Sequence, residues 1–195
     1  MLCQVAGPAR SLLSGERTAL NFIQTLSGTA STTRTFVKAI EGTTTRILDT
    51  RKTLPGLRMA QKYAVSIGGG CNHRIGLFDG VLIKENHIQA AGSITRAVEI
   101  AARSATPGGL LEVEVENLTQ LKEALSTSVS RILLDNFTRE TLQQAVTLTQ
   151  GKAELEASGN ITLENVQSIA RTGVDFISIG AITKHLQAID FSLLF

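Results

Sequence analysis

Short runs of apolar residues alternate with amphipathic segments from residue 45 to the end of this 195-residue chain. The runs have the length and the β-branched content of strands, and each is separated from the next by a segment with helical periodicity. Strands joined by helical crossovers lie parallel, so the alternation predicts an α/β fold, either a β/α barrel or a doubly wound sheet. The predicted strands are 45–50, 78–84, 110–117, 131–136, 153–160 and 174–180, and the predicted helices between them lie near 55–67, 93–105, 118–127, 138–150 and 162–172.

The first part of the chain has a different pattern. From Ser14 to Glu41 apolar residues recur with helical spacing, and Gly28 offers a stop between two helices. His185 falls in a predicted terminal helix, where we expect it to have a structural role. We therefore expect N-terminal helices followed by one α/β domain.

The third predicted strand contains LEVEVE, which favours the barrel over the doubly wound sheet. Its period of two places Glu112, Glu114 and Glu116 on one face. Helices cover the outer face of such a sheet, and carboxylates buried against them would be costly. We expect these glutamates, and Glu154 and Glu156 in the fifth predicted strand, to point into a polar interior. An edge strand with a solvated acidic face is the alternative. The prediction is an incomplete barrel of about six parallel strands with N-terminal helices.

Composition limits the classes of function. With 43% hydrophobic residues the chain can bury one sizeable core, whereas a net charge of +2 and an aromatic content of 4% are low for a nucleic-acid-binding surface. No apolar run approaches the ~18 residues of a membrane span, and the first residues lack the apolar run of a signal peptide. The two cysteines form no CxxC and suit a reducing compartment. We expect a cytoplasmic protein that binds neither nucleic acid nor membrane.

Positive charge is concentrated between Asp49 and His87, a segment that contains six Lys and Arg residues and three acidic residues. Arg51-Lys52 follows the first predicted strand, Asn72-His73-Arg74 follows a triple glycine, and Lys84 ends the second predicted strand. Guanidinium and ammonium groups bind carboxylates and phosphates, and a partly buried lysine needs an anionic partner. The pattern indicates a pocket for small anions, although each basic turn alone could be an ordinary solvated loop.

Two later turns are candidates for binding phosphate. Ser158-Gly159-Asn160 precedes a predicted helix that begins near Leu163, and Ser178-Ile179-Gly180 follows the last predicted strand. Backbone N–H groups at helix N-termini bind phosphate, and such sites recur after the last strands of barrels. Each could equally be a tight turn with a helix cap. Asp135, which closes the fourth predicted strand, could hold a ribose hydroxyl or Mg²⁺.

Seven motifs, taken in order, are similar to those of the quinolinate phosphoribosyltransferase family: GERTALNFIQTLSG, LDTRKTLPGLR, GGGCNHRIGLFDGVLIKENHI, LEVEVEN, LLDNF, SGNIT and GVDFISIGAITKH. The resemblance extends from about Gly7 to Phe195. It implies an enzyme of NAD biosynthesis that forms a homodimer, or alternatively a higher oligomer, and condenses quinolinate with phosphoribosyl pyrophosphate, using Mg²⁺. The implied products are nicotinate mononucleotide, pyrophosphate and CO₂.

The resemblance also implies roles for individual residues. Lys84, Glu114 and Asp135 are the expected catalytic residues, and Glu114 and Asp135 are also the expected ligands of Mg²⁺. Arg17 resembles an arginine that reaches into the neighbouring subunit's site. The residues expected to bind substrate are Arg17, Arg51, Lys52, Thr53, His73, Arg74, Lys84, Glu114, Asp135, Ser158, Gly159, Asn160, Ser178, Ile179 and Gly180.

The same resemblance predicts the domain organisation. Family members begin with a separate α/β sandwich domain, and the match implies that residues 1–12 are a remnant of that domain or a linker and that residues 13–195 are the catalytic barrel. The independent activity of such a barrel is then an open question. The alternatives are a non-catalytic barrel that binds phosphoribosyl ligands or a full-length partner, and a phosphoribosyltransferase that acts on another pyridine.

Overall fold

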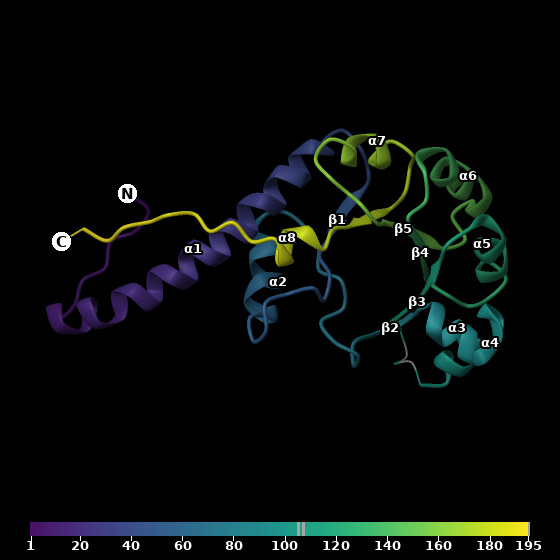
Figure 1. Ribbon diagram of the computed structural model, residues 1–195, viewed down its shortest axis with the longest axis horizontal. Coiled ribbons are helices and arrows are strands. Elements are labelled where there is room, and N and C mark those ends of the chain that lie inside the picture. The colour runs from purple at the N-terminus through teal and green to yellow at the C-terminus, as the bar shows by residue number, and fades with distance from the viewer. Residues whose placement is uncertain (105, 107, 195) are drawn as a thin grey trace.

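A ring of parallel strands surrounded by helices forms the body of the protein (Figure 1). The computed structural model describes residues 1–104, 106 and 108–194. Its strands are β1 (Arg46–Leu48), β2 (Gly80–Ile83), β3 (Leu110–Val115), β4 (Arg131–Asp135), β5 (Glu154–Ser158) and β6 (Phe176–Ser178). Its helices are α1 (Ala9–Ala39), α2 (Arg58–Ile67), α3 (Glu85–Ala91), α4 (Ile94–Ala102), α5 (Leu118–Ala124), α6 (Arg139–Thr149), α7 (Val166–Ala170) and α8 (Ala181–Lys184). Within the described residues, none of these helices is long and apolar enough to cross a membrane.

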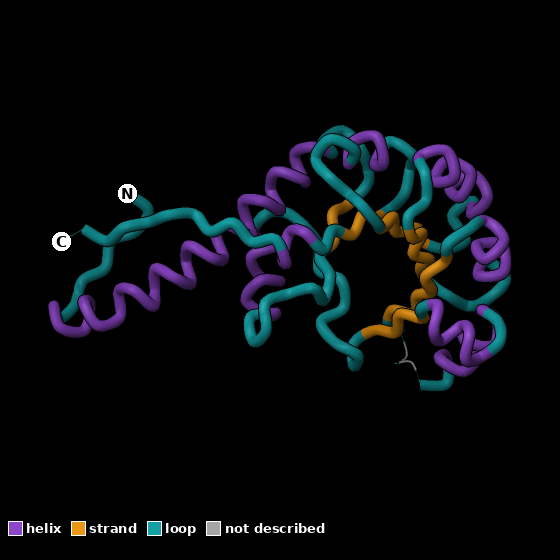
Figure 2. Tube along the Cα trace, in the orientation of Figure 1, coloured by secondary structure: helices purple, strands orange, loops and turns teal. Residues whose placement is uncertain are grey.

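The sheet is an incomplete barrel. Its strand order is β1-β6-β5-β4-β3-β2, and neighbouring strands pair in parallel, as helical crossovers require. The strands curve into a ring that is open between β1 and β2, and the helices lie outside it (Figure 2). On the open side, Cys71 forms a parallel bridge with Leu48, so the segment between α2 and β2 extends this edge of the sheet. The predicted α/β barrel is confirmed, and each strand lies within its predicted apolar run.

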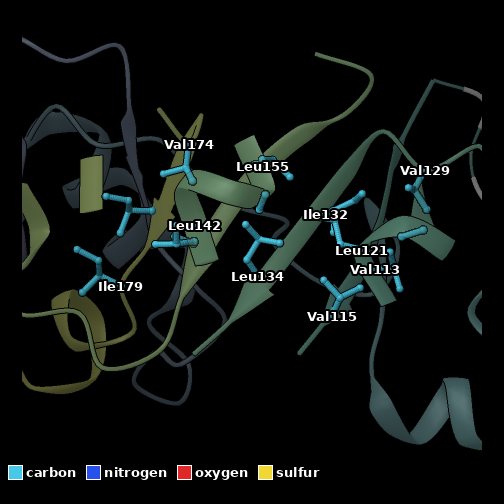
Figure 3. Packing of buried hydrophobic residues seen from close by; sticks show 14 of the residues in the cluster. Val113, Val115, Leu121, Val129, Ile132, Leu134, Leu142, Leu155, Val174 and Ile179 are labelled. Carbon is cyan, nitrogen blue, oxygen red and sulfur yellow. The ribbon is translucent and has the colours of Figure 1, made fainter. Parts of the chain in front are cut away.

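The two faces of the ring differ in polarity because side chains alternate along each strand. Glu112 and Glu156 are fully buried in the interior, and Glu114 is partly buried there. The prediction that these carboxylates point inward is confirmed, whereas Glu116 lies beyond the end of β3 and is exposed. The outward-facing side chains pack against the helices and form the hydrophobic core with them, as Figure 3 shows for Val113, Val115, Ile132, Leu134 and Leu155.

Helix α1 differs from the prediction. The sequence predicts two helices divided at Gly28, but α1 is a single helix of 31 residues in which Gly28 is buried. A Cβ atom at Gly28 would lie 2.1 Å from the carbonyl oxygen of Gln187. The C-terminal segment runs back along this helix (Figure 1), and the Ile189 N–H donates to the carbonyl of Gln24 over 3.1 Å. Gly28 therefore permits a close approach of two backbones and does not end the helix.

The starts of two other helices differ from the prediction, and one helix was not predicted. Helix α2 begins at Arg58, three residues after Pro55, and α7 begins at Val166 and not near Leu163. Helix α3 was not predicted because none of its residues is buried, so it lacks an apolar periodicity. Residue 105, which ends the predicted helix near 93–105, and residue 195, which ends the predicted barrel domain, lie outside the described residues.

The triple glycine packs α2 against α1. A Cβ atom at Gly68 would lie 2.5 Å from the carbonyl oxygen of Ala30, and one at Gly70 would lie 2.8 Å from Thr33 Cγ2. Gly69 has a φ of +89°, which favours glycine. These residues therefore place the start of the following Asn72-His73-Arg74 segment and do not themselves form an anion site.

We predict that Gly28→Ala destabilises the protein by about 1–3 kcal/mol, the usual range for overpacking a close contact. The new methyl group would have to displace the backbone at Gln187. Gly15→Ala is the matched control, because it lies in the same helix, where an added methyl group would have no atom within 4 Å, and it should be neutral or stabilising by up to about 1 kcal/mol. Urea denaturation of both variants checks this, and hydrogen exchange at residues 187–191 should rise only in Gly28→Ala. Equal stability of the two variants would contradict the close-approach role.

Candidate active site

The C-terminal ends of the strands bring most of the predicted site residues to one end of the ring. Lys84 follows β2, Glu114 lies near the end of β3, and Asp135, Ser158 and Ser178 are the last residues of β4, β5 and β6. Parallel strands end on the same side of a barrel, so residues far apart in sequence become neighbours. Adjacent positions in the register, such as Asp135 and Ser158, show this directly.

Lys84 and Glu114 form an ion pair across neighbouring strands. The Lys84 side chain is 44% exposed and that of Glu114 is 13% exposed, so the pair lies at the rim of the ring, with the carboxylate deeper than the ammonium. The Lys84 N–H donates to His87 Nδ1 over 2.9 Å, which fixes the backbone where α3 begins. Lys84 is therefore placed at the mouth of the barrel, as predicted, and Glu114 is the anionic partner that a partly buried lysine needs.

The turn at 158–160 has a defined left-handed conformation. Gly159 and Asn160 have φ values of +99° and +51°, and a Cβ atom at Gly159 would lie 2.1 Å from Asn136 Oδ1. The Asn136 N–H donates to the carbonyl of Ser158 over 2.9 Å, and Asn160 Nδ2 donates to Asn136 Oδ1 over 3.2 Å. Since α7 begins only at Val166, this turn does not stand at a helix N-terminus, contrary to the prediction. Any phosphate held here would be bound by the turn itself.

The second predicted phosphate turn contacts Lys52. Ser178 and Ile179 are buried, and α8 begins directly after Gly180. A Cβ atom at Gly180 would lie 2.9 Å from Lys52 Cδ, so the lysine stem passes over the glycine. Thr183 Oγ1 donates to the carbonyl of Lys52 over 2.8 Å. The turn and a cation more than a hundred residues earlier in the sequence thus lie side by side.

The basic residues between Asp49 and His87 form two groups. Some are held by several bonds to other protein groups, and the others could bind a ligand. Lys62 is 3% exposed and its Nζ lies 2.5 Å from Asp49 Oδ1, and it also donates to the carbonyl of His73 over 2.7 Å. Arg58 donates to Thr53 Oγ1 and to the carbonyls of Ile75 and Arg51. The expected pocket therefore loses two of its six cations to the scaffold. The sequence did not identify the buried ion pair of Asp49 and Lys62, although the thirteen positions between them, from a strand end to a helix, were a weak signal.

Arg51 and Arg74 lie close enough for their charges to interact. Burial lowers the pKa of Arg74, and the charge of Arg51 lowers it further. Two guanidinium groups that repel each other at the end of a barrel are stabilised by a bound anion. Arg74 Nη1 donates to the carbonyl of Gly80 over 2.9 Å, which fixes the direction of its side chain. Arg17, by contrast, is exposed in the N-terminal half of α1, which projects away from the ring (Figure 1).

His73 is more buried than the lysine and arginine residues predicted for the site. Its Nε2 is 2.9 Å from Glu112 Oε2 and 3.5 Å from Glu156 Oε2. Burial lowers the pKa of His73, with further lowering by Arg131 and Arg74 and an opposing effect of Glu156. Burial raises the pKa of both carboxyl groups, and for Glu156 the charge of Glu112 raises it further.

These three side chains have donor atoms within 4.8 Å of one another, which is the spacing of a metal site. They are nevertheless a poor site for Mg²⁺, which keeps several water ligands and binds substrate phosphates. The cluster is buried, and Arg131 Nη1 already lies 3.7 Å from Glu156 Oε2. Glu114 and Asp135, at the rim of the ring, have the carboxylate chemistry and the exposure that Mg²⁺ prefers.

The buried carboxyl pair predicts a pH dependence of stability. Glu156 has its pKa raised to about 8 by burial, so between about pH 4.5 and 8 the unfolded chain ionises this group while the folded chain retains its proton. Stability should therefore fall as pH rises through this window, by about 1.4 kcal/mol per pH unit for each proton of difference. Glu156→Gln should weaken this dependence, whereas Glu41→Gln, at an exposed position, should leave it unchanged. Urea denaturation at several pH values is the measurement, and parallel curves for all three proteins would contradict it.

The chain is similar to proteins of one known family over most of its length. The family model described as "Quinolinate phosphoribosyl transferase, C-terminal domain" matches residues 29–194. The chain belongs to the quinolinate phosphoribosyltransferase family. A probable nicotinate-nucleotide pyrophosphorylase (carboxylating) of Bacillus subtilis is 46% identical over 193 residues, covering 99% of this chain and 67% of the relative. A quinolinate phosphoribosyltransferase (decarboxylating) of Nicotiana tabacum is 44% identical over 208 residues, covering 97% of this chain and 59% of the relative.

Solved structures of the family have the same fold. The nicotinate-nucleotide pyrophosphorylase of Francisella tularensis is 55% identical, with a TM-score of 0.90 over 93% of this chain and 65% of that protein. The corresponding protein of Ehrlichia chaffeensis is 50% identical, with a TM-score of 0.86 over 92% of this chain and 65% of that protein. The chain spans about two thirds of the length of most of these family members.

Proposed function

We propose that this chain is the catalytic barrel of a quinolinate phosphoribosyltransferase, which makes nicotinate mononucleotide from quinolinate and phosphoribosyl pyrophosphate. The observation that carries the proposal is that Arg51, Lys52 and Lys84 follow the C-terminal ends of β1 and β2, with Arg74 close to Arg51 and Lys52 lying over Gly180. Both substrates are polyanions, so each needs several cations. The family membership of the chain supports the same substrates.

The arrangement suggests how the two substrates would be placed. Arg51, Arg74 and Lys84 would bind the two carboxylates of quinolinate, because guanidinium groups grip carboxylates bidentately. The turns at 158–160 and 178–180 would hold the 5′-phosphate, and Lys52, which lies over Gly180, would face the pyrophosphate. Thr53 would contribute mainly through Arg58, to which its hydroxyl is bonded.

The reaction replaces one bond at ribose C1 with another. The bond to pyrophosphate breaks, the pyridine nitrogen attacks C1, and positive charge develops on the ribose during the exchange. Glu114 and Asp135 would stabilise this charge and hold the ribose hydroxyls, since a carboxylate fixed in position stabilises positive charge that develops beside it. Loss of CO₂ then leaves an electron pair on the ring carbon next to the quaternised nitrogen, whose positive charge stabilises it, and a proton from water forms the new C–H bond. Apart from this proton, both steps need positioning and charge and no nucleophile from the protein.

Glu114 and Asp135 are also the residues that would bind Mg²⁺. Bound there, the ion would neutralise the charge of the leaving pyrophosphate. We predict that chelation abolishes turnover and that Mg²⁺ restores it. Glu114→Gln should raise the Mg²⁺ concentration needed for half-maximal rate by about tenfold or more, because one charged ligand is lost. Unchanged Mg²⁺ dependence in this variant would remove Glu114 from the metal site.

The test of the proposed function is the formation of nicotinate mononucleotide by the purified chain from quinolinate, phosphoribosyl pyrophosphate and Mg²⁺. Glu114→Gln serves as the impaired control. Binding of phosphoribosyl pyrophosphate without product at high protein concentration would support the non-catalytic alternative. Preferential turnover of nicotinate would support a phosphoribosyltransferase for another pyridine.

We include two further features of the family resemblance in the proposal. One is a homodimer in which the partner subunit's Arg17 completes the site, since Arg17 lies on the projecting half of α1 (Figure 1). The other is a cytoplasmic location. Analytical ultracentrifugation, together with restoration of activity in mixtures of an Arg17→Ala chain with a Lys84→Ala chain, would test the dimer.

A further inference from the structure

The ring nitrogens of His73 have different partners. Nδ1 accepts the backbone N–H of Arg74 over 2.7 Å. A nitrogen that accepts from an amide carries no proton of its own, and a neutral imidazole has one proton. The proton of His73 is therefore on Nε2, and the ring cannot be an imidazolium while this hydrogen bond persists.

The surroundings of Nε2 agree with this tautomer. Nε2 faces Glu112 Oε2 at 2.9 Å and Glu156 Oε2 at 3.5 Å, and both glutamates are fully buried. Among the described residues, the carboxyl oxygens of these two glutamates have no hydrogen-bond partner of good geometry. A neutral carboxyl group keeps one acceptor oxygen and a carboxylate has two, so in either form these glutamates can accept from a proton on Nε2. Both ring nitrogens are thus directed at the protein.

The Arg74 amide is held on its other side as well. Asp49 Oδ1 accepts the backbone N–H of His73 over 2.8 Å, and Lys62 Nζ donates to the carbonyl of His73 over 2.7 Å. The backbone of residues 73 and 74 is therefore fixed by a buried ion pair and by an imidazole. Together with the bond from Arg74 Nη1 to the carbonyl of Gly80, these contacts determine where the guanidinium points.

We propose that His73 is a neutral positioning residue that aims Arg74 at the substrate, and not one of the cations that contact the substrate. This revises the role that the family resemblance implies for His73. The inference rests on the proposed function only for the identity of the anion that Arg74 binds. The lowered pKa of His73, caused first by burial, agrees with a neutral ring.

The tautomer can be measured without any activity. In ¹⁵N-detected correlation spectra of the full chain, His87→Gln and His185→Gln assign the three histidines. We expect His73 to show a protonated Nε2 and an unprotonated Nδ1 throughout about pH 6 to 8, with no change on addition of quinolinate. The groups facing the ring are Glu112, Glu156, Arg131, Arg74 and Lys62. An imidazolium, a protonated Nδ1, or loss of the Nε2 proton on addition of Zn²⁺ would overturn the proposal.

Kinetics separates positioning from direct contact. In His73→Asn the side-chain oxygen can replace Nδ1 as the acceptor for the next amide, whereas His73→Leu has a similar size and no acceptor. We expect the KM for quinolinate to rise about threefold at most in His73→Asn but about tenfold or more in His73→Leu, since an unpaired buried amide is costly. The KM for phosphoribosyl pyrophosphate should change less than about threefold in both variants.

Equal losses in the two variants would overturn the positioning role, because a substrate-binding cation would be missing from both. The outcomes are distinguishable from a failure of the proposed function. If the chain proved inactive, the spectra would still decide the tautomer, and quinolinate binding measured by calorimetry would replace KM. The spectra of the unsubstituted chain likewise decide the matter if either His73 variant fails to fold.

Discussion

Replacing Arg74 with alanine should raise the KM for quinolinate by about 100-fold, as expected for removal of a partly buried charge that binds a carboxylate. The guanidinium is held by the carbonyl of Gly80 and is destabilised by Arg51 when no anion is present. We propose that quinolinate is the anion that Arg74 binds, so its affinity should depend on both the fixed guanidinium and the repulsion from Arg51. The KM for phosphoribosyl pyrophosphate should therefore change much less. Arg74→Lys should remain impaired by about tenfold, since an ammonium group cannot bind a carboxylate bidentately.

Steady-state kinetics with each substrate varied in turn checks this prediction. Arg96→Ala is the matched control, because Arg96 is an exposed arginine on α4 that pairs with Glu99. It should leave both KM values unchanged. If Arg74→Ala weakened both substrates equally, the assignment of Arg74 to quinolinate would be wrong. If Arg74→Lys were fully active, bidentate recognition would be wrong.

Replacing Lys62 with methionine should lower the free energy of unfolding by about 3–5 kcal/mol, the cost of leaving a buried charge without its partner. Asp49 is fully buried, and its other partners are the Asn72 side chain and the His73 backbone. Those two donors do not replace a positive charge. Because the same pair supports the segment that carries Arg74, the variant should also bind quinolinate more weakly.

A double variant distinguishes charge from packing. In Asp49→Asn/Lys62→Met the uncompensated charge is gone, so much of the lost stability should return. Lys122→Met, at an exposed position of α5, should change stability by less than about 0.5 kcal/mol. Urea denaturation of the four proteins gives the comparison. A double variant no more stable than Lys62→Met would show that packing and not charge determines the effect.

The strands were predictable because their signal is local. Each of the six is a short apolar run whose outward residues pack on helices, so the period-2 pattern and the inward glutamates could be read from the chain. The residues at the strand ends followed from the same assignment. Helix α3 was missed because it is short and none of its residues is fully buried. Gly28 was misinterpreted because, in the sequence, a glycine that admits a distant backbone cannot be distinguished from one that ends a helix.

The partners of the charged residues were not predictable from local pattern. In the sequence, Lys62, Arg58 and Arg51 each contribute one positive charge and cannot be distinguished. In the structure, Lys62 pairs with Asp49 and Arg58 donates to backbone carbonyls. The sequence likewise makes His73 a candidate cation, and only the structure shows that its Nδ1 accepts the backbone N–H of Arg74. In each case the deciding atom is a neighbour only in the folded chain, or a backbone group whose direction the sequence does not specify.

The sequence by itself determined the parallel α/β barrel, the polar interior, and the order of motifs that identifies the family. Alternating burial along strands and the shared end of parallel strands are sufficient physical reasons for the first two. Only the tertiary structure decided which cations are available, how deep each side chain lies and which ring nitrogen of His73 carries the proton. Those properties depend on desolvation and on distances of a few ångströms between distant segments, such as the 2.5 Å between Lys62 Nζ and Asp49 Oδ1.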